Sequence, residues 1–574
     1  MADSFHSTRR QFLRTTLAAG ACGLTMPAWV EAADDAKPAA PLARPRGKAP
    51  FKVLFSNDTT NILTCASPYN ALPTTVSSAT TPQWPSGRFT PAMLEASVDE
   101  TAGMGIDVHL LQPGYGWVPW WKSKAYPFAE HVRFMKEQFG SEPSVDGFAE
   151  YMAGGGDIVD VFVRRCREKG LKPFISFRLN DSHGRELMDS PRERNSGFGW
   201  AVLCPTLVEH PEWRIGTDLK DWKQRPLNWQ IPEVRELKFR YIRELIEQYD
   251  LAGFELDFLR FPSFFRQGET TSEERGRIMN QFVRDVRRTL DDNTPSGQRR
   301  WLSVRIPCYL EAHDRLGIDV RAFADAGVDM FNLSAYYFTE QQTDAPAIKR
   351  LLPDSAVYAE MTHTTCVGPA LKKTPGDNFL FRRTTDEQFY TTAHLAYARG
   401  LEGVSTFNFV YFRQHGSEGR GPFREPPFHV FPHLGDRAWL ARQPQHYILA
   451  SVWNEPPVAR QLSKRLRPAQ SAEFRLDMAP PTGGWTKTGK LRIQSKEPMG
   501  EAQLTASFNG QELAPTDDLA EPYPNRDPSM LATRETARGW SVPAELPVDG
   551  VNRLVLTMRT GQPVEVLLLD LAIA

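Results

Sequence analysis

The segment Gly253-Phe254-Glu255-Leu256-Asp257-Phe258 alternates apolar and acidic side chains, and this alternation decides the fold. Successive side chains of a strand point to opposite faces, so the apolar residues share one face and the two acids share the other. In a barrel of parallel strands, one face packs under the helices and the other points to the axis. We therefore expect Glu255 and Asp257 to point inward, with Asp257 nearer the C-terminal rim.

Similar strand segments recur along residues 51–446 and alternate with amphipathic helical patterns. Strands are expected at residues 52–57, 106–112, 171–180, 253–258, 301–307, 330–336, 356–362 and 403–409. Helices are expected at residues 93–104, 158–169, 233–249, 272–290, 320–326 and 386–399. Three of these helices end at Gly170, Gly327 and Gly400, and glycine is typical of a helix C-terminus. The pattern predicts a (β/α)8 TIM barrel over residues 51–446.

A doubly wound open sheet is the alternative α/β fold. That fold would bring a glycine-rich phosphate-binding loop, and Gly154-Gly155-Gly156 lacks the required GxGxxG spacing. Beyond the barrel, residues 465–574 show short alternating segments separated by Gly, Pro and Asp turns. They predict a small antiparallel β-sandwich domain, for which sugar binding and packing support are both open roles.

The N-terminus has the features of an export signal. Arg9-Arg10 precedes a mild apolar stretch, and Val30-Glu31-Ala32 supplies small residues before a cleavage point. Residues 1–32 resemble a twin-arginine (Tat) signal peptide, which implies a periplasmic or extracellular protein. Residues 33–50, rich in alanine and proline, are expected to be a linker.

Composition narrows the possible partners. The chain has 68 basic and 69 acidic side chains, which disfavours nucleic acid and anionic membranes as partners. No apolar run reaches the roughly 18 residues needed to cross a bilayer. Five cysteines follow the signal, an odd number without a CxxC pair, so buried free thiols are expected: Cys65, Cys166, Cys204, Cys308 and Cys366.

The same alternation sends other polar side chains toward the axis. They are Ser176, Arg178, Asn180, Arg305, Asn332, Ser334, Tyr336, Glu360 and Asn408. TIM-barrel interiors are usually filled by Val, Ile and Leu, so this set is unusual. It permits two interpretations: a buried salt-bridge layer in which the arginines neutralise Glu255 and Asp257, or a site that performs chemistry.

Carboxylates facing each other across a polar cavity are the minimum equipment for glycoside hydrolysis. One must be ionised to attack or to activate water, and the other must carry a proton for the leaving oxygen. We predict Asp257 as nucleophile or base and Glu360 as acid, with Glu255 a substitute for either. The residues predicted to bind substrate are Arg178, Asn180, Arg260, Arg305, Asn332, Tyr336, Asn408, Trp117, Trp120 and Trp121.

Aromatic loops support a carbohydrate partner. Seven of the 14 tryptophans follow the strands at 106–112 and 171–180: Trp117, Trp120, Trp121, Trp200, Trp213, Trp222 and Trp229. Aromatic faces stack on the apolar faces of sugar rings. Because the run from Tyr115 to Trp121 is hard to bury entirely, we expect some of its rings to face a groove. The segment Asn180–His183 is expected to be a loop cap, the alternative being contact with substrate or a cation.

A family resemblance rests on residues 253–262. This segment resembles the signature D-G-hydrophobic-x-hydrophobic-D-Tyr-hydrophobic-Arg-Tyr-Pro of the glycosyl hydrolase-like family 10 barrels, and residues 324–330 are similar to that group's segment entering its sixth strand. Asp257 and Arg260 match the family's Asp and Arg, which implies a sugar-facing catalytic Asp. The segment also resembles the α-amylase type, whose Asp is a nucleophile, although Glu255 stands where that group has Arg.

Three hypotheses follow. The first is a secreted glycoside hydrolase acting on a polysaccharide or oligosaccharide, and the second is a carbohydrate-binding barrel without catalysis. The third, a metal-assisted hydrolase or deacetylase, is disfavoured because the histidines lack HxH or HExxH spacing. We expect no metal and no cofactor.

Overall fold

The computed structural model describes residues 48–58, 62, 89–142, 148–183, 197–367, 381–412, 426–453, 457–525 and 533–574. The predicted signal peptide, most of the linker and Cys65 lie outside the described residues. The described residues belong to one compact unit, Arg44–Ala574. Within them, no helix is both long enough and apolar enough to cross a membrane.

Eight parallel strands close into a barrel in the order β1-β10-β7-β6-β5-β4-β3-β2. The strands are β1 Val53–Asn57, β2 Val108–Leu111, β3 Lys172–Arg178, β4 Gly253–Asp257, β5 Trp301–Pro307, β6 Met330–Ser334, β7 Ala356–Thr362 and β10 Gly403–Phe407. Each corresponds to a strand expected from the sequence, so the TIM barrel is confirmed. The alternative of an open sheet is wrong, because β1 pairs with both β2 and β10 and leaves no edge.

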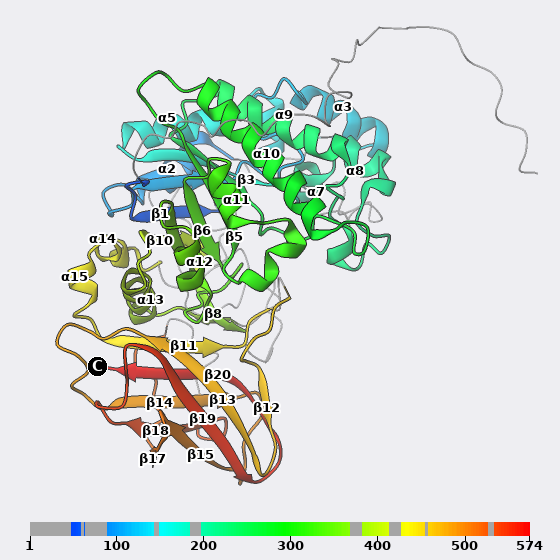
Figure 1. Ribbon diagram of the computed structural model, residues 1–574. Helices are drawn as coiled ribbons and strands as arrows, with labels where there is room; N and C mark the ends of the chain where they lie inside the picture. The colour runs from blue at the N-terminus through cyan, green and yellow to red at the C-terminus, as the bar shows by residue number, and fades with distance from the viewer. Residues whose placement is uncertain are drawn as a thin grey trace, which may run out of the picture. The chain divides into compact units, whose positions relative to one another are not determined.

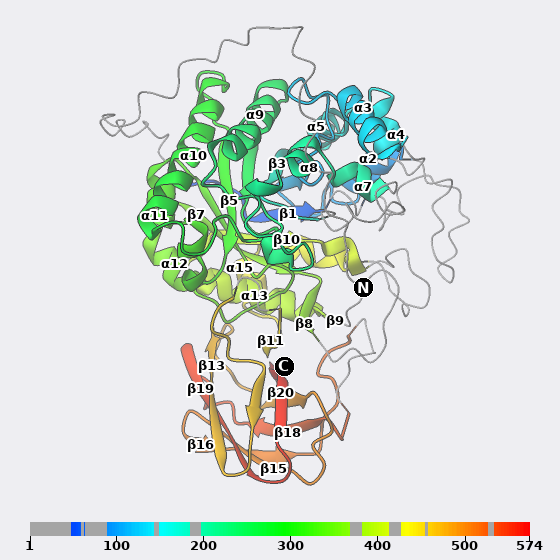
Figure 2. The same cartoon turned by 90° about the vertical axis from the view of Figure 1, so that its right-hand side faces the viewer.

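Helices surround the strands, as Figures 1 and 2 show for α9 to α12. The expected helices are α2 Pro91–Asp99, α5 Ile158–Glu168, α9 Pro232–Gln248, α10 Ser272–Asp292, α11 Val320–Asp325 and α13 Asp386–Ala398. The described residues also form helices that were not expected from the sequence: α3 Phe128–Phe139, α4 Phe148–Ala153, α7 Gly197–Val202, α8 Pro205–Glu209, α12 Ala345–Leu351, α14 Phe431–Leu434 and α15 Arg437–Leu440. All of these except α3 have seven residues or fewer, too few for a helical pattern of apolar residues to repeat.

Local sequence explains where the longer helices begin and end. The side chain of Thr271 accepts a hydrogen bond from the Glu274 backbone N–H, and Glu274 accepts one in return, which forms a capping box at α10. At the other ends, Gly170, Gly327 and Gly400 have φ values of 75°, 103° and 82°. These left-handed conformations favour glycine, so the predicted helix stops are confirmed.

The predicted alternation of outward apolar and inward acidic side chains along β4 is also confirmed. Phe254, Leu256 and Phe258 are fully buried in the core between barrel and helices. The ring of Phe258 lies 5.7 Å from that of Phe323 on α11. The alternate residues Glu255 and Asp257 contact inward-facing side chains of β3 and β5.

The C-terminal part of the chain forms two antiparallel sheets. One has the order β11-β20-β14-β18-β17, with β12 also paired to β20, and the other has the order β13-β19-β15-β16. The strands are β11 Gln445–Ala450, β12 Lys464–Leu466, β13 Gln470–Met478, β14 Gly489–Ser495, β15 Gln503–Phe508, β16 Gln511–Glu512, β17 Ala514–Thr516, β18 Ala537–Val542, β19 Gly550–Thr560 and β20 Val564–Ile573. Apolar residues of both sheets share one core cluster, among them Phe474 of β13 and Leu491 of β14.

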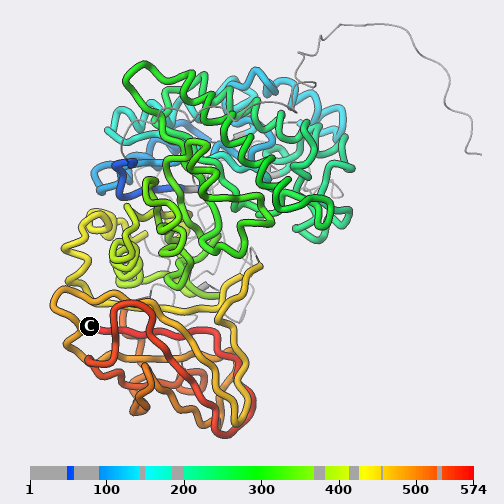
Figure 3. The backbone as a smooth tube through the Cα atoms, in the orientation of Figure 1, coloured from blue at the N-terminus to red at the C-terminus, as the bar shows by residue number. Residues whose placement is uncertain are grey.

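Polar contacts connect these sheets to the barrel. Figure 3 traces the backbone from the barrel, through its yellow segments, into the orange and red strands. The side chain of Gln341 bonds the His446 carbonyl at 3.1 Å and accepts from the Ile448 N–H at 2.8 Å. Arg399 at the end of α13 pairs with Asp477 of β13 at 2.6 Å. A short hairpin of β8 Thr364–Val367 and β9 Phe381–Arg383 lies off the barrel sheet.

Candidate active site

Glu255 occupies the deeper of two polar layers inside the barrel. Strand register places it beside Ser176 of β3 and Ser303 of β5. Its carboxyl oxygens accept hydrogen bonds from Ser176 Oγ at 2.7 Å, Ser303 Oγ at 3.0 Å and Asn332 Nδ2 at 3.4 Å. No ion pair joins Glu255 to an arginine among the described residues, so the interpretation in which Arg178 and Arg305 neutralise Glu255 does not hold for this residue.

Burial raises the pKa of Glu255 to about 7, and the negative charges of Asp257 and Glu360 act in the same direction. The side chain is completely buried, which disfavours its charged form. The hydrogen bond from Ser176 and the nearby charge of Arg305 offset only part of this cost. Glu255 is therefore protonated through most of the acidic pH range.

Asp257 lies at the C-terminal end of β4, one layer nearer the rim. Its described partners are all N–H donors: Arg305 Nη1 at 3.2 Å, the Leu259 backbone N–H at 2.9 Å and Gln112 Nε2 at 3.3 Å. Donors of this kind favour the charged carboxylate. Asp257 is completely buried by these contacts.

Glu360 of β7 binds the other side of the same guanidinium. Arg305 Nη2 and Nε donate to its two oxygens at 2.6 and 2.7 Å, a bidentate geometry. Asn332 Nδ2 and the Ser334 hydroxyl donate to it as well. Arg305 thus bridges Asp257 and Glu360, and its own pKa is raised because their negative charges outweigh its burial.

Arg178 organises a second cluster on the other side of Asp257. Its guanidinium binds Asp58 at 2.6 Å and Asp181 at 2.9 Å. It also donates to Gln112 Oε1, the amide whose nitrogen reaches Asp257. Burial alone would raise the pKa of Asp58 and of Asp181, but the charge of Arg178 helps to hold both below their usual range. Gln112 and Asp58 were not predicted as site residues, and Asp181 was expected in a loop cap. The available sequence signal was that each stands at or just beyond the C-terminal end of an expected strand, where barrel active sites lie.

Four further predicted residues also lie at this end of the barrel. Asn180 fastens two loops by bonding the backbone of Leu227 and the Ser263 carbonyl. Asn408 has φ 53° and accepts from the Asp58 backbone N–H at 3.1 Å. Tyr336 has φ 67°, and its carbonyl accepts from Arg305 at 3.2 Å. Asn332 donates to both Glu255 and Glu360.

The expectation that the tryptophans after β2 face a groove is wrong. Trp117, Trp120 and Trp121 are only 0, 4 and 1% exposed. The Trp117 indole N–H donates to the Asp181 carbonyl and its ring lies under the Lys238 ammonium, 3.2 Å from the ring centroid. The indole N–H of Trp121 bonds Glu244 of α9. Polar partners on α9, which spacing along the chain does not reveal, fix these rings inside the loop.

Half-buried aromatic rings instead gather beyond β6 and β10. Tyr337 stacks on Trp453 with ring centroids 5.2 Å apart and lies 6.2 Å from Tyr411. Tyr336 lies 6.3 Å from Trp453. We call Tyr336, Tyr337, Tyr411 and Trp453 the rim aromatics. The run Tyr336-Tyr337-Phe338 after a strand was the available sequence signal, whereas Trp453 comes from the chain beyond β11.

The segment Asn180–His183 behaves as the expected loop cap. Asp181 accepts from the backbone N–H and the ring of His183, both at 2.8 Å. Within the described residues, no three His, Cys, Asp or Glu side chains are grouped as metal ligands. Cys166, Cys204, Cys308 and Cys366 are buried free thiols, as expected.

Comparisons with known proteins give fold neighbours only. No family model and no curated protein matches the chain. Solved structures that resemble it include an α-L-fucosidase of family GH29 from Bacteroides thetaiotaomicron, at 12% identity over 88% of this chain and 93% of that one, with a TM-score of 0.36. Another is a chitinase from Chromobacterium violaceum, at 10% identity over 68 and 100% of the two chains, with a TM-score of 0.32. Similarities at TM-scores this low say nothing about the chemistry of this chain.

Proposed function

We propose that the chain is a glycoside hydrolase in which Asp257 is the attacking carboxylate or the base. The observation that supports it is the set of N–H donors around Asp257 at the C-terminal end of β4, the end of such barrels where active sites lie. Donors from Arg305, Leu259 and Gln112 orient the carboxylate and can balance its negative charge. A nucleophile or base for glycoside cleavage needs both properties.

The net charge of the cluster formed by Asp257, Glu360, Arg305 and Glu255 suits the same reaction. Asp257 and Glu360 share the single positive charge of Arg305, and Glu255 is neutral below pH about 7. The cluster therefore carries one net negative charge. Positive charge develops at the sugar ring in the transition state, and a fixed negative charge at that place lowers the barrier.

This proposal changes the role of Glu360. Both of its oxygens accept hydrogen bonds from Arg305, Asn332 and Ser334, so neither is directed toward a substrate. We assign Glu360 to positioning Arg305. Burial raises the pKa of Glu255 to about 7, so we assign Glu255 as the proton-carrying carboxyl of the site.

The rim aromatics suit a carbohydrate substrate. Tyr336, Tyr337, Tyr411 and Trp453 are half-buried, so their rings keep surface that a sugar face would cover. Trp453 follows β11 of the C-terminal sheets, which we interpret as the predicted β-sandwich. We further propose that the protein is exported through the Tat route to the periplasm or beyond.

The second candidate is a carbohydrate-binding barrel without turnover. The full pairing of Asp257 and Glu360 with Arg305, at 0 and 3% exposure, is the observation that favours it. Buried acids that only balance an arginine need no reaction.

One experiment separates these candidates. The purified full chain is incubated with a panel of polysaccharides, and newly released reducing ends are measured. Under the hydrolase proposal, wild type releases reducing ends and Asp257→Asn releases none while keeping its circular dichroism spectrum. Asp292→Asn, an exposed change on α10, is the matched control and stays active. Glycan binding without release by wild type would favour the binding barrel, and full activity in Asp257→Asn would move catalysis elsewhere.

A further inference from the structure

Unlike Arg178 and Arg305, Arg260 has no carboxylate oxygen within hydrogen-bond distance among its described contacts. It stands three residues after Asp257 and is 7% exposed. Its Nη2 lies 3.1 Å from His183 Nε2, and its Nε is 4.0 Å from the nearest carboxylate oxygen, on Asp181. Among the described residues, that Nε has no hydrogen-bond acceptor.

The other two arginines of the site are arranged differently. Arg178 and Arg305 are each within 2.6 Å of a carboxylate and each contact two acids. A buried guanidinium is costly unless acceptors surround it, and these two satisfy that requirement internally. Asp58 and Asp181, the acids near Arg260, are already engaged with Arg178.

Two aromatic rings lie close to the Arg260 guanidinium. The guanidinium carbon lies 5.4 Å from the centroid of Tyr336, a rim aromatic, and 5.9 Å from that of Phe261. The ring of His183 in turn lies 4.7 Å from Phe261. Rings around a guanidinium orient it while leaving its N–H edge to a planar acceptor. Carboxylate and sulfate groups fit that edge with two parallel hydrogen bonds.

Resting on the proposed hydrolase function, we propose that Arg260 binds an anionic substituent of the sugar next to Asp257, so that the substrate is an acidic glycan. The shared chemistry is an oxyanion with two acceptor atoms, as in a uronic acid carboxylate or a sulfate ester. Arg260 would then select the substrate, and the rim aromatics would hold its apolar ring faces.

The test uses matched pairs of glycans that differ only in the anion. One pair is a uronic acid oligosaccharide and its carboxyl-reduced form, and the other is a sulfated galactan oligosaccharide and its desulfated form. Binding to the full chain is measured by calorimetry, and cleavage by reducing ends. We expect wild type to prefer the charged member of one pair by about 10- to 100-fold, the range for hydrogen bonds to a charged group. Which pair shows the preference identifies the anion.

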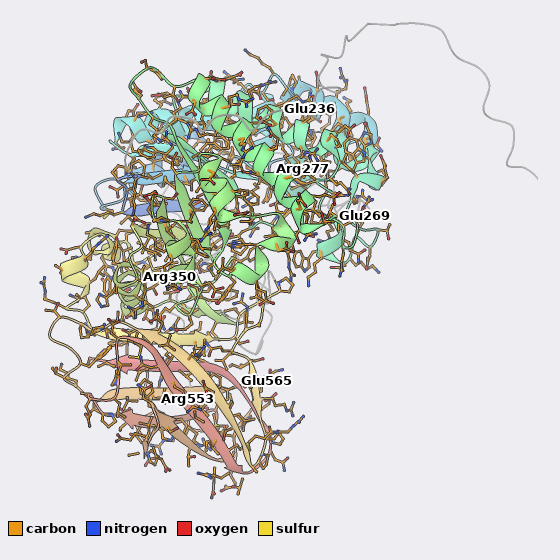
Figure 4. The ribbon with its side chains drawn as sticks, in the orientation of Figure 1. Glu236, Glu269, Arg277, Arg350, Arg553 and Glu565 are labelled. Carbon is orange, nitrogen blue, oxygen red and sulfur yellow. The ribbon has the colours of Figure 1, made fainter. Side chains whose placement is uncertain are left out.

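Variants assign that preference to one side chain. Arg260→Gln is expected to reduce the ratio of charged to neutral binding to near one, and Arg260→Lys to reduce it partly because lysine lacks the two-pronged edge. Arg277→Gln removes the same charge from an exposed position on α10 and should leave the ratio unchanged (Figure 4). Equal binding of both members of each pair by wild type, or an unchanged ratio in Arg260→Gln, would overturn the inference.

Failure of the hydrolase proposal gives a different result. A preference for charged glycans that Arg260→Gln abolishes, without release of reducing ends, supports the anion site and refutes hydrolysis. Cleavage of neutral glycans with no preference for charged ones supports hydrolysis and refutes the anion site.

Discussion

Replacing Glu255 by glutamine is expected to stabilise the protein above pH 7 and to change little at pH 5. The carboxyl has its ordinary pKa of 4.5 in the unfolded chain and a pKa of about 7 in the fold, where burial disfavours its charge. A carboxyl with a raised pKa binds more protons in the folded state, so the free energy of unfolding falls as pH rises between these two values. The difference of about 2.5 pH units corresponds to about 3 kcal/mol, fully lost above pH 7.

Glutamine is the appropriate substitute because it has the shape of the protonated glutamate and never ionises. The hydroxyls of Ser176 and Ser303 bond the two oxygens of Glu255. A hydroxyl both donates and accepts, so either serine can turn to accept from the new amide. At pH 5 the folded Glu255 is neutral and only the unfolded chain is ionised at this position, so the two proteins should differ in stability by no more than about 1 kcal/mol.

Denaturant unfolding followed by tryptophan fluorescence at pH 5, 6, 7 and 8 measures the effect. The expected result is a difference between Glu255→Gln and wild type that grows from about 1 kcal/mol at pH 5 to about 3 kcal/mol at pH 8. Glu236→Gln, an exposed change on α9, is the control and should show no such trend (Figure 4). A difference that does not vary with pH, or a variant less stable at pH 8, would refute the assignment of a raised pKa to Glu255.

Two further predictions concern the loop after β2 and the rim aromatics. Gly116 has φ 77°, and a Cβ there would collide with the Arg178 carbonyl, so Gly116→Ala should lower the free energy of unfolding by about 2–4 kcal/mol. Gly140→Ala, with φ 63° and no neighbour within 4 Å, isolates the backbone strain and should cost about 1 kcal/mol in the same denaturant assay. Trp453→Ala removes the ring stacked on Tyr337 and should raise KM for a cleaved oligosaccharide about tenfold with little change in kcat. Trp485→Ala, whose indole bonds Gln445, is its control, and equal effects of the two would argue against sugar stacking at Trp453.

The barrel could be predicted from the sequence because its determinants are local. Period-two segments, capping residues such as Thr271 and glycines such as Gly327 each act within a few residues. The inward direction of Glu255 and Asp257 followed from parity alone, since a shift of one residue would have placed phenylalanines on the axis. These predictions therefore depended on no knowledge of distant contacts.

The site was predicted less well because its partners come from distant parts of the chain. The pairing of Asp257 and Glu360 through Arg305 joins β4, β5 and β7, and no spacing rule encodes it. The burial of Trp117 depends on Lys238, and Trp453 reaches Tyr337 from beyond the barrel. An aromatic residue in a loop has the same sequence signature whether it packs inward or lines a rim.

The polar interior itself argues for chemistry rather than stability. Branched apolar residues usually fill the cores of TIM barrels, and replacing buried ion pairs by such residues is often neutral or stabilising. A purely structural network would also leave no acid without a cation, as Arg305 achieves for Asp257 and Glu360. Glu255 departs from that rule, because its described partners are hydroxyl and amide groups and its charge is disfavoured by burial. A carboxyl whose pKa is raised by burial, directly beneath a carboxyl held by N–H donors, is a recurrent arrangement of acid–base catalysis.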